Sequence, residues 1–303
     1  MSIMQNSGHS KFILTPIIGI LQDTVNACAG IGKGIETQSL GEYVLQTTFL
    51  KMTGASEQKL KCICWEMATN DYDYRYHYLR KNYGECSSYT DKCSIYKDIQ
   101  ERICKLDSSF KISALFNDID ITSKEKYLIK QKVKETQKKQ EAKKKRKLTE
   151  EEVEKLAKGM NSFYAKKGLC DKEKTLFSRM VEFESVQDRV DKIIARSIVA
   201  QWEHHNYMNY LSYWKSLSSW GFAEGDALFC KELQDFYSNH VYVHRNRCAH
   251  NLMSFQNNLP TLKTLVGKEH IIANYYFYFS VLILLDDIFV RLYKAYTCAM
   301  HQQ

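Results

Sequence analysis

Residues 271–291 read IIANYYFYFSVLILLDDIFVR, a strongly apolar stretch near the end of the chain. A membrane-spanning helix needs about 18–20 nearly uncharged residues. This stretch contains Asn274, Asp286, Asp287 and Arg291, which are costly inside a bilayer. We therefore interpret it as a buried core helix over about 269–298, in a soluble protein that makes no membrane contact.

Helix-breaking residues are scarce, with only 2 prolines and 13 glycines among 303 residues. This scarcity favours long helices over a turn-rich β fold. Apolar residues recur at three- and four-residue intervals through much of 1–122, in 178–220, and in the two segments that begin near Asp226 and at residue 239. The sequence predicts an all-α protein, with a helical bundle in its C-terminal half and an additional, mostly helical N-terminal region.

Two N-terminal segments give more detailed expectations. Thr15 and Pro16 are a suitable N-cap and first helical residue for the apolar segment that follows. The segment 71–85, DYDYRYHYLRKNYGE, alternates tyrosines in a way that suits a short strand, and a surface loop is an equal alternative. Tyrosines in this region can stack on nucleic-acid bases, although packing in a core or interface is their more common use.

A strongly basic segment, residues 124–147, lies near the middle of the chain and is called the basic arm. Between Lys124 and Lys147 there are twelve basic residues and three glutamates, so this segment carries +9 while the whole chain carries +8. Thr149 and Glu152 then match a capping box that begins a new helix. We expect a helical connector at 123–160, between the N-terminal region 1–122 and a helical domain at 161–303. The arm is either an RNA-binding element or a solvated linker, and its RNA-binding candidates are Lys143, Lys144, Lys145, Arg146 and Lys147.

Ten cysteines raise the question of disulfides or a metal site. No secretory signal opens the chain, so reduced thiols in a cytoplasmic protein are expected. Cys62 and Cys64 would point about 200° apart on a helix, and Cys86 and Cys93 lack the spacing of common zinc motifs. We therefore expect buried thiols, no metal site and no cofactor.

The stretch VHRNRCAHN, residues 243–251, concentrates basic side chains beside small residues. Arg245 is followed by His250 with four residues between them, a spacing that no other histidine of the chain repeats. Histidine can act as acid or base near neutral pH, and arginine binds phosphate oxygens through two parallel hydrogen bonds. The pair therefore suits metal-independent cleavage of RNA by its own 2′-OH.

Helical geometry limits how this pair can act. Residues five apart lie about 140° apart around a helix, whereas Asn246 and His250 share a face. We expect Arg245 to sit at the start of its helix, or the site to be completed across an interface. A two-fold dimer would bring two motifs together, and Cys248 and Ala249 are small enough to permit a close approach.

The string RNRCAHN resembles the R-x4-6-H signature of the HEPN superfamily, and is similar in particular to bacterial abortive-infection proteins. The resemblance covers roughly 165–303. It implies a helical bundle and a homodimer with a composite, metal-independent ribonuclease site, in which Arg245 and His250 are catalytic and Asn246 supports them. Toxin members often have a tyrosine two residues after the histidine, where this chain has Leu252, so regulation through that tyrosine is not expected.

The same resemblance implies a toxin or anti-phage defence setting, with RNA as substrate and an antitoxin, an activator or a guide RNA as further partners. His244 and Arg247 flank the motif and either contact RNA phosphates or are exposed charges with no role. Glu203 is a candidate to orient Arg245, whereas His204 and His205 point about 100° apart and do not suit a metal. The alternative function is a catalytically inactive HEPN-like module that binds RNA or a nucleotide.

Overall fold

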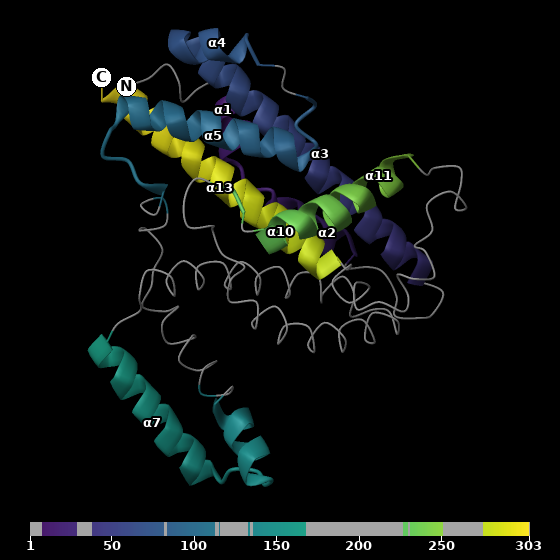
Figure 1. The fold of residues 1–303 in the computed structure, drawn as a ribbon. Helices are drawn as coiled ribbons and strands as arrows, with labels where there is room; N and C mark the ends of the chain where they lie inside the picture. The colour runs from purple at the N-terminus through teal and green to yellow at the C-terminus, as the bar shows by residue number, and fades with distance from the viewer. Residues whose placement is uncertain are drawn as a thin grey trace. The chain divides into compact units, whose positions relative to one another are not determined.

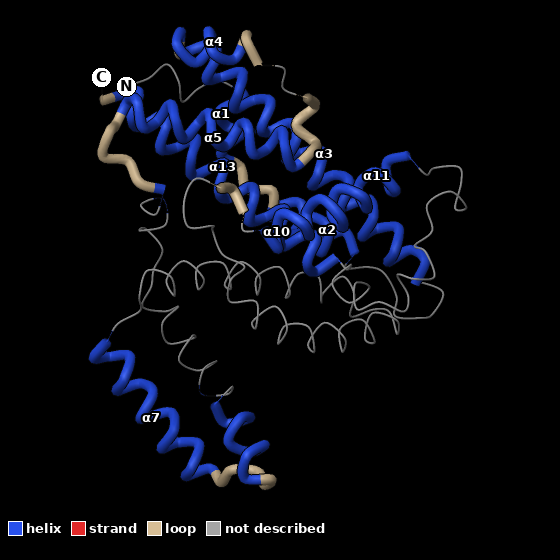
Figure 2. Tube along the Cα trace, in the orientation of Figure 1, coloured by secondary structure: helices blue, strands red, loops and turns tan. Residues whose placement is uncertain are grey.

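The computed structural model describes residues 8–28, 38–81, 84–112, 115, 133, 136–167, 227–229, 231–250 and 275–302. In these ranges the regular elements are helices and no strand occurs, which confirms the all-α prediction (Figures 1 and 2). The chain divides into two compact units. The first contains 1–115 and 182–303, and the second contains 116–181. The first unit therefore includes helices from both the N-terminal and the C-terminal parts of the chain.

Helix α13, Tyr275–His301, is the central helix of the first unit. It packs against α3, Gln38–Asn70, and α5, Tyr89–Leu106 (Figure 1). Its apolar side chains are almost fully buried, among them Phe277, Phe279, Leu282, Leu285, Ile288 and Leu292. The expected core helix is confirmed over its described part, while residues 269–274 lie outside the description. Among the described helices none is long and apolar enough to span a membrane.

A buried ion pair joins the N-terminal helices to this core. Lys59 of α3 donates to Asp286 of α13 at 2.5 Å, and the two side chains are only 2% and 4% exposed. Lys59 also donates to the Thr15 carbonyl at 2.7 Å, and Asp286 accepts from the Ile17 backbone N–H at 3.0 Å. The pair therefore fixes the link between α1, Gly8–Leu14, and α2, Ile18–Ala27.

The expected Thr15–Pro16 cap is wrong in detail. Helix α2 begins at Ile18 with Ile17 as its N-cap, and no side chain caps it. The Thr15 hydroxyl donates instead to the Lys11 carbonyl at 2.8 Å. The buried Asp286 carboxylate satisfies a backbone N–H at the start of α2, so a local cap is not needed.

The tyrosine-rich segment that could have been a strand or a loop forms helix α4, Tyr72–Tyr78. Asp71 caps it by accepting from the Tyr74 backbone N–H at 3.0 Å. The other Asp71 oxygen accepts from Arg102 at 2.5 Å and from Tyr296 at 3.3 Å. This cap also ties α4 to α5 and α13, which explains why a short helix forms where alternation suggested a strand.

The cysteines considered for a metal site are buried or half-buried. Cys62 and Cys64 lie in α3, Cys86 precedes α5, and Cys93 lies within it. Burial raises the pKa of Cys64 to about 12. In the described part of the chain, no group of three or more histidine, cysteine or acidic residues has the geometry of a metal site.

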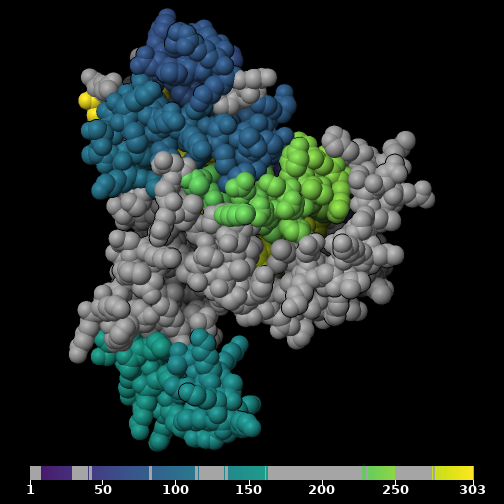
Figure 3. Space-filling model, in the orientation of Figure 1, coloured from purple at the N-terminus to yellow at the C-terminus, as the bar shows by residue number. Residues whose placement is uncertain are grey.

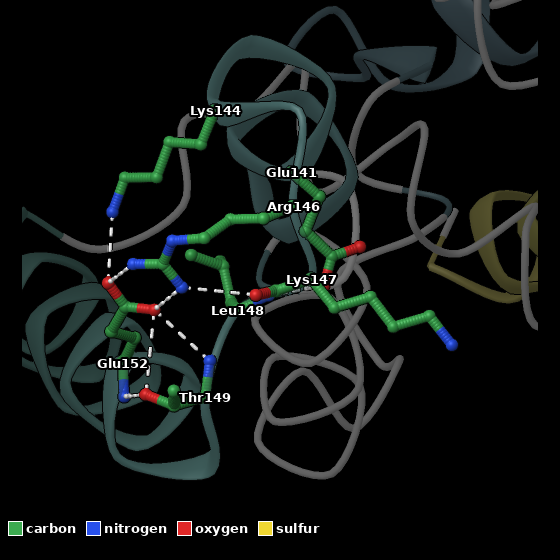
Figure 4. Close-up of polar contacts among 7 residues, drawn as sticks. All are labelled: Glu141, Lys144, Arg146, Lys147, Leu148, Thr149 and Glu152. Carbon is green, nitrogen blue, oxygen red and sulfur yellow. Dashed lines mark hydrogen bonds and ion pairs between the residues drawn. The ribbon is translucent and has the colours of Figure 1, made fainter.

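The described part of the second unit contains a helical segment at 136–144 and helix α7, Glu150–Lys167. The predicted capping box is confirmed. The Glu152 N–H donates to the Thr149 hydroxyl at 3.4 Å, and the Thr149 N–H donates to the Glu152 carboxylate at 3.1 Å (Figure 4).

Candidate active site

The motif lies on a helical run that changes its pitch just before Arg245. Helix α10, Lys231–Phe236, continues into a π-helical turn at Tyr237–Val241 and then into α11, Tyr242–His250. The Tyr242 N–H donates to the Tyr237 carbonyl, five residues earlier. Single π turns inside α-helices often occur at functional sites. Arg245 therefore lies within a continuous helical run, and the expectation that it sits at a helix start is wrong.

Arg245 is held by an acidic residue of α3. Its Nη2 donates to Glu57 Oε2 at 3.1 Å, and its Nη1 donates to Asn246 Oδ1 at 3.2 Å. The Arg245 and Glu57 side chains are 26% and 15% exposed. The guanidinium is thus oriented by two neighbours and still reaches solvent. Of the three expected catalytic residues, the structure brings Arg245 and Asn246 into direct contact.

Glu57 was not found by sequence reasoning, which proposed Glu203 as the acid that orients Arg245. Glu203, His204 and His205 lie outside the described residues. Glu57 is 188 residues before Arg245, and it is one of several charged residues of α3. Only the packing of α11 against α3 distinguishes it from the others.

Two buried side chains add to the charge environment of Glu57. Burial lowers the pKa of Lys92 to about 8, and the neighbouring Glu57 partly offsets this decrease. Lys92 donates to the carbonyls of Cys86 and Ser87 and lies 5.4 Å from the Tyr237 ring centroid. Burial also raises the pKa of Tyr237 well above its ordinary value. The contact between Arg245 and Glu57 therefore lies beside two side chains, Lys92 and Tyr237, that are largely shielded from water.

His244 occupies an aromatic cage rather than an open surface. Its ring stacks on Tyr278 with 4.8 Å between centroids, and it contacts Phe49 at 4.9 Å. Its Nε2 lies 3.2 Å from the Tyr275 hydroxyl and 3.5 Å from the Cys248 sulfur. Burial, followed by the charge of Arg247, lowers its pKa to about 4. A half-buried imidazole whose pKa is lowered to about 4 is poorly suited to bind RNA phosphate.

The remaining motif residues are described to different extents. Arg247, Cys248 and Ala249 are partly exposed. His250 ends α11, and its side chain lies outside the description. Because α11 is helical from Tyr242 to His250, Arg245 and His250 leave the helix axis about 140° apart. The predicted helices at 178–220 and residues 251–258 also lie outside the described residues.

Two of the basic arm candidates, Lys144 and Arg146, bind the same carboxylate, that of Glu152. Arg146 binds the Glu152 carboxylate through both terminal nitrogens at 2.8 and 3.0 Å, and Lys144 donates to it at 3.0 Å. These contacts, led by Arg146, lower the pKa of Glu152 to about 2. Lys147 extends away from that carboxylate (Figure 4). Lys143 and Lys145 are exposed, and Lys145 adopts a positive φ of 50° in the turn.

No protein-family model matches this chain, and no curated protein or solved structure is significantly similar to it.

Proposed function

We propose that this protein is a metal-independent endoribonuclease in which Arg245, Asn246 and His250 form the catalytic group. The observation that carries the proposal is the orientation of Arg245 by Glu57 and Asn246 at a partly exposed position. A guanidinium held in this way can stabilise the negative charge that develops on a phosphate during cleavage. The 2′-OH attacks the adjacent phosphorus, the 5′-oxygen leaves, and a 2′,3′-cyclic phosphate forms.

The proposed site is composite. On one copy of α11, positions 245 and 250 lie about 140° apart around the helix axis, which favours a site completed by a second copy. A second copy related by two-fold symmetry would place its motif against the first and supply two imidazoles, one as base and one as acid. RNA is the proposed substrate, and abortive infection or a toxin system is the proposed setting.

The alternative is an inactive RNA- or nucleotide-binding module. It would use the partly exposed side chains of Arg245 and Arg247 to bind phosphate without cutting the RNA. The two functions differ in whether the bound RNA is cut.

The test is cleavage of labelled single-stranded RNA in the presence of EDTA. Wild type is compared with Arg245→Ala and His250→Ala, after circular dichroism and sedimentation have matched their helicity and oligomeric state. Cleavage by wild type alone, with cyclic-phosphate ends, supports the proposed enzyme. Binding without cleavage by all three proteins supports the alternative.

A further inference from the structure

Helix α4 exposes an unusual amount of aromatic surface. Tyr72 is 88% exposed, Tyr76 56% and Leu79 75%, whereas Tyr74 is only 3% exposed. Successive tyrosines in this segment are two residues apart, so they lie about 200° apart on a helix. The alternation that looked like a strand thus buries Tyr74, leaves Tyr78 half-buried, and exposes Tyr72 and Tyr76 to solvent.

The exposed side chains share one face of α4. Tyr72 and Tyr76 are about 40° apart around the axis and about 6 Å apart along it. Arg75 belongs to the same arc and is also exposed. Figure 3 shows α4 at one end of the described part of the first unit, with one face of it uncovered in that view.

One tyrosine of this face already holds a planar cation. The Arg80 guanidinium lies 3.9 Å from the Tyr76 ring centroid and donates to the Tyr76 hydroxyl. Such stacking orders the ring and keeps a positive charge beside it. Asp73 is the acidic residue of α4 itself, and it is paired with Arg102 at 3.0 Å. The outer face therefore combines exposed tyrosine side chains, one of them stacked on Arg80, with excess positive charge.

We infer that the outer face of α4 is a stacking platform for single-stranded RNA, in which Tyr72 and Tyr76 stack on bases and Arg75 and Arg80 contact phosphates. Aromatic rings interleaved with cations are the features that single-strand-binding surfaces share. A duplex hides the faces of its bases, so it does not fit this platform. An apolar protein partner would be expected to use Leu79, which distinguishes it from RNA in the test below.

The platform extends the proposed function, on which its role in cleavage rests. Helix α3 carries Glu57 of the candidate site and ends at Asn70 beside α4. These two positions are about 20 Å apart along the helix axis. An RNA strand that reaches both must be several nucleotides long. Cleavage of a long strand therefore depends on the platform, whereas cleavage of a very short strand does not.

Binding is tested with the full chain and a fluorescent 2′-O-methyl oligouridine, which cannot be cut because it lacks a free 2′-OH. Fluorescence anisotropy compares wild type, Tyr72→Ala, Tyr76→Ala and the double Tyr→Phe variant. Each alanine variant is expected to bind about ten-fold more weakly, and the double phenylalanine variant to bind like wild type. Circular dichroism and thermal unfolding must show that the variants remain folded.

Leu79→Ala is the matched control on the same face, and it is expected to leave binding unchanged. Equal weakening by Leu79→Ala and Tyr76→Ala would show that RNA binding at this face does not depend on ring stacking, and would overturn the inference. Wild-type binding that no tyrosine variant alters would overturn it as well. Because the probe reports binding alone, these outcomes are separate from the EDTA cleavage test: the platform stands if RNA binds there but is not cut.

Discussion

Glu57 and Arg245 form an ion pair at 3.1 Å between α3 and α11, although 188 residues separate them in the chain. This contact links the candidate motif to the longest helix of the core. It also sets the direction in which the guanidinium points. Since neither side chain is far from solvent, the pair can be dissected by substitution without removing a fully buried group.

Glu57→Gln is expected to lower the free energy of unfolding by about 1–3 kcal/mol, because it leaves a half-buried guanidinium without its counter-charge. If Arg245 is catalytic, RNA cleavage should also decrease at least ten-fold, since the guanidinium loses its orientation. Urea unfolding and a cleavage assay measure the two effects. The control is Glu85→Gln, which alters an exposed partner of Lys61 and should change neither quantity. A loss of stability with full cleavage would exclude a positioning role for Glu57.

Lys59→Met is expected to destabilise the first unit by about 3–5 kcal/mol, because it leaves the buried Asp286 carboxylate without its counter-charge. Urea unfolding measures the change. The double variant Lys59→Met with Asp286→Leu should regain part of the loss. It should not regain all of it, since the Ile17 N–H then lacks its acceptor. Lys61→Met, at an exposed pair, is the matched control and should leave the unfolding midpoint nearly unchanged.

Unfolding should depend on pH through His244. Its folded pKa is about 4, mainly because the ring is buried, whereas an unfolded histidine titrates near 6.5. The unfolded chain therefore binds a proton that the folded chain rejects between these values. Stability present above pH 6.5 is lost as the pH falls toward 4, by at most about 3 kcal/mol.

Urea unfolding between pH 7 and pH 4.5 measures this loss. His244→Phe removes the titrating ring and should flatten that part of the profile. Tyr275→Phe keeps the burial and should retain most of the slope. An unchanged slope in His244→Phe would assign the pH dependence to another group.

The basic arm offers a matched pair of charge variants. Lys143→Gln with Lys145→Gln removes two exposed cations, and Lys144→Gln with Arg146→Gln removes two that are paired with Glu152. If the arm binds RNA, the first double variant should reduce the salt slope of single-strand binding by about 1.4. The second should reduce it less, because Glu152 already balances part of that charge. Anisotropy titrations at several salt concentrations measure both slopes. Equal slopes in all three proteins would identify the arm as a solvated linker.

Local signals in the sequence were reliable where the structure is also local. The capping box at Thr149 and Glu152 formed as expected, because all its partners lie within four residues. The Thr15–Pro16 cap did not form, since the distant Asp286 binds the Ile17 N–H. The alternating tyrosines alone do not predict that residues 72–78 form a helix. The helix depends on Asp71, which is fixed by Arg102 and Tyr296 from two other helices.

The sequence by itself determined that this protein is helical, that its apolar C-terminal segment is a core helix, and that Arg245, Asn246 and His250 form one motif. Sparse helix breakers and apolar periodicity are properties of neighbouring residues, so they can be recognised without a fold. Only the tertiary structure decided that Glu57 orients Arg245, that His244 is enclosed by aromatic rings, and that Tyr72 and Tyr76 face solvent. These features depend on which helices pack together. Packing brings together residues that are far apart in the chain, and nothing in the sequence near either residue indicates the contact.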